Sequence, residues 1–131
     1  MGNLRYNNVT ILWYFIICLL IASCGRKPIK LSQTERKALE SSISSKRNID
    51  TLIVLQKRME KEGNILGSVI AYKEMGKLMR NDSQFDDALR WHSEGLDLAK
   101  EVGDTAEWIQ ALNNIGTDYR RRGILMEPRL A

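Results

Sequence analysis

Cysteine, histidine and proline are scarce in this chain, and their scarcity limits which kinds of protein it can be. The 131 residues include two cysteines, two prolines and one histidine. Cys18 and Cys24 both lie in or beside an apolar run near the N-terminus, so they cannot supply a disulfide framework or a zinc site. The histidine, His92, has no cysteine or second histidine at ligand spacing. We therefore expect neither a metal nor a cofactor.

No catalytic constellation stands out in the sequence. Asp86 and Asp87 are adjacent carboxylates, but neighbouring residues of a helix point to different sides, and no nucleophile accompanies them. His92 falls on the apolar stripe of its expected helix, where histidines are more often packed than catalytic. We expect a protein that is not an enzyme.

The positive charge of the chain is local. The formal net charge is +4, yet residues 24–47 hold seven basic and two acidic side chains, whereas residues 48–131 hold 12 basic and 14 acidic ones. The chain therefore has no broad basic face, and no motif that reads a nucleic-acid groove accompanies the charge. We expect no nucleic-acid partner.

Residues 1–23 are typical of a secretory signal peptide. Arg5 supplies a positive start, and residues 9–20 form an apolar run that is shorter than the roughly 20 residues of a membrane span. The following Ile21-Ala22-Ser23-Cys24 resembles the lipobox of bacterial lipoproteins. An uncleaved signal anchor, with Cys24 an ordinary residue, is the alternative.

The lipobox resemblance implies a cellular location. Cys24 would carry acyl chains such as palmitate, become the first residue after cleavage, and hold the protein to a membrane of the bacterial cell envelope, outside the cytoplasm. Gly25 after the cysteine favours the periplasmic face of the outer membrane. Residues 24–32 would then form a basic tether between lipid and domain.

The remainder of the chain predicts an all-α fold. No stretch alternates with a period of two, and proline occurs only at positions 28 and 128. Ser32 followed by Glu35 indicates a capping box that starts a weak, serine-rich helix over 33–47. Firmer helices are expected over 48–62, 64–80, 84–101 and 105–122, the last ended by Gly123. In that last helix we expect the following side chains to face inward: Trp108, Ala111, Leu112, Ile115 and Tyr119.

One pattern occurs twice at a spacing of 40 residues. Its recurring pairs are Gly63 and Gly103, Ala71 and Ala111, Gly76 and Gly116, and Arg80 and Arg120. A repeat of this length is typical of one helical unit stacked on copies of itself. We expect Gly76 and Gly116 to face partner helices that approach closely.

The repeated segments resemble tetratricopeptide repeats. An aromatic or large apolar residue, a large residue before glycine, and another large residue recur in the first helix of each unit, as Tyr72, Met75-Gly76, Met79 and Leu112, Ile115-Gly116, Tyr119. Phe85-Asp86-Asp87-Ala88 matches the second helix. The resemblance implies antiparallel helix pairs over 48–131, in a solenoid whose last repeat is truncated because Pro128 stands where alanine is expected.

The resemblance also implies a binding groove lined by the first helices. Carried over by position, the candidate groove residues are Lys73, Lys77, Arg80, Asn113, Thr117 and Arg120. Such a face would bind an acidic peptide or a terminal carboxylate. An ordinary solvated helix face is the alternative.

These features give three functional hypotheses. The first is a membrane-anchored helical-repeat module that binds a protein or peptide without catalysis. The second is the truncated sensory portion of a membrane-bound signal-transduction regulator whose output domain is missing. The third is a truncated remnant with no independent function.

Overall fold

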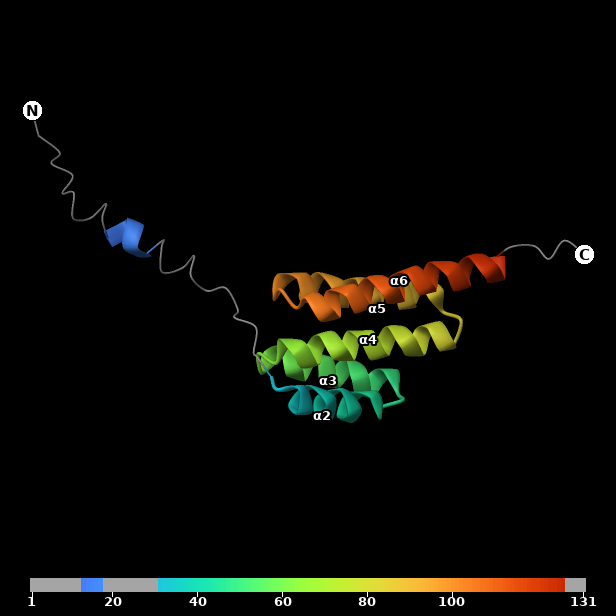
Figure 1. Cartoon of the computed structure of the whole chain (residues 1–131), viewed down its shortest axis with the longest axis horizontal. Helices are drawn as coiled ribbons and strands as arrows, with labels where there is room; N and C mark the ends of the chain where they lie inside the picture. The colour runs from blue at the N-terminus through green and yellow to red at the C-terminus, as the bar shows by residue number, and fades with distance from the viewer. Residues whose placement is uncertain (1–12, 18–30, 127–131) are drawn as a thin grey trace, which may run out of the picture.

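The computed structural model describes residues 13–17 and 31–126, and every regular element in these ranges is helical. The packed helices are α2 (Gln33–Ser44), α3 (Ile49–Lys61), α4 (Ile65–Asn81), α5 (Phe85–Glu101) and α6 (Thr105–Met126). The all-α prediction is confirmed for these residues (Figure 1). None of the described helices is both long and apolar enough to cross a membrane. Cys24 and Pro128 lie outside the described residues.

Side-chain caps fix where the helices begin. The Ser32 hydroxyl accepts from the backbone N–H of Glu35 at 3.3 Å, and the Glu35 carboxylate accepts from the backbone N–H of Ser32 at 2.8 Å. The expected capping box is confirmed, and the serine-rich segment after it stays helical to Ser44. At the start of α4, the Asn64 side chain accepts from the N–H of Gly67 at 3.0 Å.

Two glycines reverse the chain in equivalent turns. Gly63, between α3 and α4, has φ of 73°, and Gly103, between α5 and α6, has φ of 71°. An L-residue with a side chain would be strained in this left-handed conformation. The helices on either side of each glycine can therefore run antiparallel through a turn of very few residues, as the colours of Figure 1 show for α5 and α6. In the turn between α4 and α5, Ser83 takes the positive φ, at 61°.

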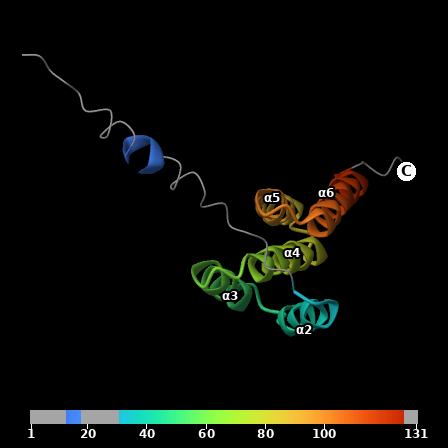
Figure 2. The same ribbon diagram turned by 60° about the vertical axis from the view of Figure 1, so that its left-hand side comes forward.

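Helix α4 lies at the centre of the arrangement and contacts each of the other four packed helices. Figure 2 views the bundle obliquely along the helices and shows α2 and α3 below α4, with α5 and α6 above it. Its first turns are almost wholly buried, from Ile65 to Ala71. A helix that is apolar around most of its circumference is expected at such a central position.

The core between α2, α3 and α4 is aliphatic. Ile43, Leu52, Ile70 and Met75 are fully buried there. Burying each of these side chains contributes about 1.5–3 kcal/mol. This core holds α2 against the repeated part of the chain.

Helix α5 approaches α4 closely at two glycines. A Cβ on Gly76 would overlap the imidazole of His92, and a Cβ on Gly95 would lie 3.2 Å from that of Tyr72. The Tyr72 ring also stacks on Trp91, with centroids 5.9 Å apart. The expected close approach at Gly76 is confirmed.

The predicted orientation of α6 is wrong for Trp108, Leu112 and Tyr119 and correct for Ala111. Trp108, Leu112 and Tyr119 are 40%, 48% and 59% exposed, whereas Glu107 and Asp118 are buried along with Ala111. The physical reason is that both carboxylates meet cations on α2 and α4. The stripe that holds Glu107, Ala111 and Asp118 therefore turns inward, and the stripe that holds Trp108, Leu112 and Tyr119 turns outward.

Two further expectations for α6 are also corrected. Gly123 does not end the helix, which continues to Met126. A Cβ placed on Gly116 would meet no atom within 4 Å, so no helix of the described residues approaches it. Among residues 13–17 and 31–126, nothing packs on this side of α6 as α5 packs on α4.

Candidate functional site

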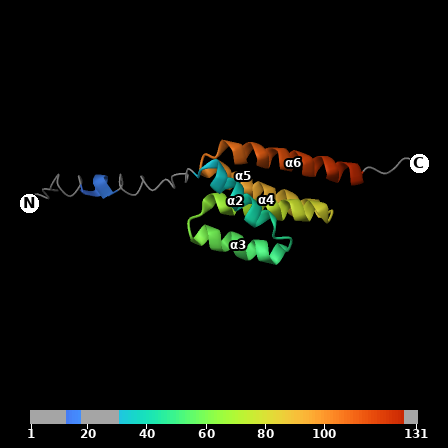
Figure 3. The same cartoon turned by 60° about the horizontal axis from the view of Figure 1, so that its bottom comes forward.

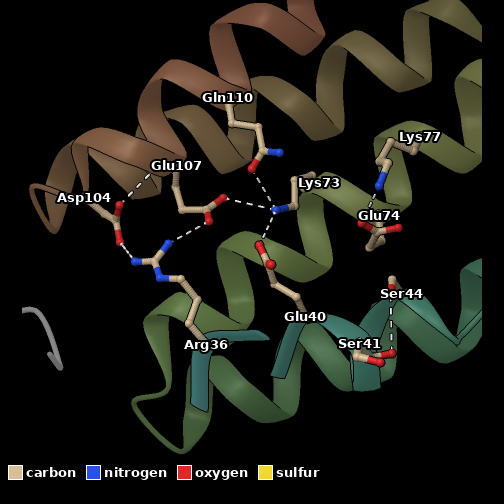
Figure 4. Close-up of polar contacts among 10 residues, drawn as sticks. All are labelled: Arg36, Glu40, Ser41, Ser44, Lys73, Glu74, Lys77, Asp104, Glu107 and Gln110. Atoms are coloured by element: carbon tan, nitrogen blue, oxygen red, sulfur yellow. Dashed lines mark hydrogen bonds and ion pairs between the residues drawn. The ribbon is translucent and has the colours of Figure 1, made fainter. Parts of the chain in front are cut away.

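Charged side chains from α2, α4 and α6 meet where these helices lie side by side (Figure 4). Lys73 of α4 is the hub. Its ammonium group lies 3.1 Å from a carboxylate oxygen of Glu40, 3.3 Å from one of Glu107 and 2.9 Å from the side-chain oxygen of Gln110. Lys73 is 8% exposed, so its ammonium group contacts side chains of α2 and α6 in place of water.

Arg36 of α2 extends this cluster toward the start of α6. Its guanidinium donates to Asp104 and, at 2.9 Å, to Glu107. Burial by itself lowers the pKa of Arg36, but the hydrogen bond and the charge of Asp104 outweigh it and raise that pKa overall. Burial by itself raises the pKa of Asp104. The hydrogen bond from the backbone N–H of Glu107 and the Arg36 guanidinium outweigh burial, so the pKa of Asp104 is lowered overall. Both groups therefore stay ionised near neutral pH.

A second cluster joins α4, α5 and α6. Arg80 donates to the Asp118 carboxylate at 3.0 Å and reaches Asn114 at 3.3 Å. The other oxygen of Asp118 contacts Nδ1 of His92. Asp118 is fully buried, so it requires both partners to offset the loss of hydration.

His92 is held neutral in this cluster. Burial lowers its pKa, and the hydrogen bond and charge of Asp118 offset only part of that effect. With Nδ1–H donating to Asp118, Nε2 is the acceptor nitrogen, and it is buried without a protein partner among the described residues. A cavity of about 10 Å³ beside the ring is lined by Val69, Lys73, His92, Gly95, Glu107, Ala111 and Asn114. That is room for one water molecule at most.

The six predicted groove residues fall into two groups. Lys73 and Arg80 are committed to α6, through Glu107 and Gln110 in one case and through Asp118 and Asn114 in the other. The other four keep contact with solvent: Lys77, Asn113, Thr117 and Arg120.

The accessible group makes only local contacts. The Lys77 ammonium lies 2.7 Å from Glu74 on its own helix, and the Lys77 side chain is 43% exposed. The Thr117 hydroxyl donates to the backbone oxygen of Asn113 at 2.9 Å. Exposed pairs of this kind contribute about 0–1 kcal/mol, so an arriving ligand can replace them.

Four acidic residues of these clusters were not among the sequence-derived candidates: Glu40, Asp104, Glu107 and Asp118. On α6 a signal exists, because Glu107, Ala111 and Asp118 recur at helical spacing and define one polar face. Their partners Arg36, Lys73 and Arg80 lie on two other helices. Local sequence patterns therefore cannot show that the charges meet.

Comparison of the chain with protein-family models, with curated proteins and with solved structures found no match. The geometry of the described residues must therefore support any assignment. In residues 13–17 and 31–126, no three His, Cys, Asp or Glu side chains gather in a way that could hold a metal ion.

The lowered pKa of His92 predicts a pH dependence of stability. The unfolded histidine titrates near pH 6.5, above the folded one, so the unfolded chain binds the extra proton between the two values. The free energy of unfolding should rise with pH up to about 6.5 and then level off. Urea midpoints at about pH 5.5 and 7.5 measure this rise.

The matched variant is His92→Gln, which keeps a polar side chain that cannot titrate. Because the chain has one histidine, we expect the rise between these two pH values to shrink in this variant. An unchanged rise would contradict the assignment.

Proposed function

We propose that this chain is a lipid-anchored, extracytoplasmic module of tetratricopeptide type, with a 40-residue period, that binds a protein or peptide partner and is not catalytic. The observation that carries the proposal is the layer formed by α2, α4 and α6, whose buried charges are neutralised internally while its rim stays polar and accessible.

Equivalent turns support the repeat. Gly63 and Gly103 share a positive φ, and the residues after them, Asn64 and Asp104, both cap a helix. Asn64 accepts from the N–H three residues on at 3.0 Å, and Asp104 does so at 3.1 Å. The two units thus begin with the same local geometry, 40 residues apart.

The buried ion pairs act as structural supports for the proposed groove. Lys73 and Arg80 hold α6 against α4. A groove made of separate helices binds well only if the helices keep their spacing before the ligand arrives, because ordering them on binding would weaken the complex. In this proposal Lys73 and Arg80 fix the groove, and the exposed residues contact the ligand.

The accessible cations favour an acidic partner. Lys77 and Arg120 are the charged members of the exposed group. Carboxylates form charge-assisted hydrogen bonds with both side-chain types. Asn113 and Thr117 can add hydrogen bonds to the peptide backbone, as extended-peptide recognition requires.

The state of His92 supports the absence of catalysis. The ring is 1% exposed, its Nδ1 contacts Asp118, and Gly76 lies directly against it. A general base must reach the proton that it removes. The His92–Asp118 pair is therefore assigned to structure.

The peptide-binding proposal is tested with a display library of random twelve-residue peptides, selected on the full chain in detergent. We expect acidic peptides to be enriched. Lys77→Glu with Arg120→Glu should weaken their binding at least tenfold by fluorescence anisotropy, because both cations become repulsive.

Arg58→Glu is the control, since Arg58 is an exposed cation on α3 and pairs only with Glu62 within its own helix. An equal loss in the control, or no enrichment of acidic peptides, would contradict an acidic ligand in this groove.

The membrane anchor is tested separately. In a bacterial host, palmitate labelling of the full chain should require Cys24, and Cys24→Ala should abolish both the label and the cleavage that follows it. Cys18→Ala is the matched control and should remain labelled. A wild-type chain that is neither labelled nor shortened would refute the lipoprotein assignment.

A further inference from the structure

Helix α6 presents an uncovered apolar face. Trp108, Ile109, Leu112 and Tyr119 are 40% to 59% exposed and recur at helical spacing. We call these four residues, with Ile115, Gly116 and Gly123, the outer face of α6. Figure 3 shows α6 along one edge of the helices, with none of the packed helices on its outer side. Contiguous apolar surface of this kind marks an interaction site.

The corresponding face of α4 shows which kind of element covers such a surface. Forty residues before Ile109 and Tyr119 stand Val69 and Met79, which are 3% and 9% exposed. Tyr72, the counterpart of Leu112, stacks on Trp91 of α5. On α4 this register is therefore covered by an antiparallel helix.

The two glycines of this register differ in the same sense. A Cβ at Gly76 would overlap the ring of His92, whereas a Cβ at Gly116 would meet nothing within 4 Å. Gly123 lies two helical turns after Gly116, and a Cβ there would also meet nothing within 4 Å. The outer face thus combines large apolar side chains with two glycines that leave open space. On α4 the same combination is packed closely against another helix.

We propose that the partner is α6 of a second copy of this chain, packed antiparallel. Its two-fold axis would pass between Ile115 and Gly116. Residues equally distant from that axis then meet: Trp108 with Gly123, Leu112 with Tyr119, and Ile115 with Gly116. Two of the three pairs put a large side chain opposite a glycine. A two-fold interface requires such self-complementarity, because one surface must fit itself.

Charge decides between the two directions. Arg120 and Arg122 lie near the C-terminal end of α6, and Arg122 pairs with Asp86 of α5 at 3.0 Å. A parallel pair would bring the two arginine groups together. An antiparallel pair separates them by placing each beside the N-terminal half of the other α6, and it also opposes the helix dipoles. The second copy therefore docks antiparallel.

Disulfide cross-linking of full-length chains tests this register. Two tagged chains, both carrying Cys18→Ser and Cys24→Ser, are co-expressed, one with Leu112→Cys and the other with Tyr119→Cys. Oxidation should join the two tags, because these positions face each other. As a matched control, Arg121→Cys should not be joined to Leu112→Cys, since Arg121 is exposed on a different side of α6.

A mass measurement supplies the second arm. Light scattering on the full chain in detergent should give a dimer for the wild type and a monomer for Leu112→Lys. Leu112 is already 48% exposed in the single chain, so circular dichroism should show unchanged helix content. Asn113→Lys, at the exposed neighbouring position, should remain dimeric.

A monomeric wild type, or a Leu112→Lys variant that stays dimeric, would overturn the proposal. So would cross-linking of Leu112→Cys to a different protein with no cross-link between copies, which would indicate a foreign helix on this face. Peptide binding in the groove involves other residues, so the two proposals can fail independently.

Discussion

The buried ion pair between Lys73 and Glu107 is the contact on which the arrangement of the helices depends. Each charge is almost excluded from water, and each is satisfied by groups from other helices, Lys73 with Glu40 and Gln110 and Glu107 with Arg36. Burying unpaired ions would cost several kcal/mol each, so α6 has a strong electrostatic reason to present Glu107 to α4. Once Glu107 and the parallel pair of Asp118 with Arg80 face inward, the apolar stripe with Trp108 must face outward. One set of contacts thus produces both a rigid polar layer and an uncovered apolar edge.

The elements of the fold could be predicted from the sequence because their determinants are local. The Ser32 and Glu35 capping box, the cap at Asn64 and the turn glycines Gly63 and Gly103 all act within a few residues. The orientation of α6 could not be predicted in the same way. Hydrophobic periodicity identifies which face of a helix is apolar, but whether that face is covered depends on which other helix is present. The same reasoning was correct for α4 at Met75 and Gly76, because Met75 packs in the core with α2 and α3 and α5 lies against Gly76.

The repeat in the sequence suggested candidate groove residues, but it could not predict their electrostatic state. The 40-residue register brought out Lys73, Lys77 and Arg80 as cations of one helix. It gave no reason to expect that Lys73 and Arg80 would be neutralised by carboxylates more than 30 residues away in the chain. Because they are buried or nearly so, Lys73 and Arg80 hold α6 against α4 and are not free to contact a ligand. Of the four candidate cations, only Lys77 and Arg120 then keep an accessible charge. In the proposed groove, the attraction to an acidic ligand would be weaker than four free cations would give, but the helices would already be in place before binding.

The central claim is that Lys73 and Glu107 are coupled, and a double-mutant cycle measures that coupling directly. Lys73→Met, Glu107→Gln and the double variant are compared with the wild type by urea unfolding of the full chain. The account predicts that each single change is strongly destabilising and that the double variant loses less than the two together, with a coupling free energy of about 1–3 kcal/mol. Additive losses, with no coupling, would contradict the claim that this ion pair sets the orientation of α6.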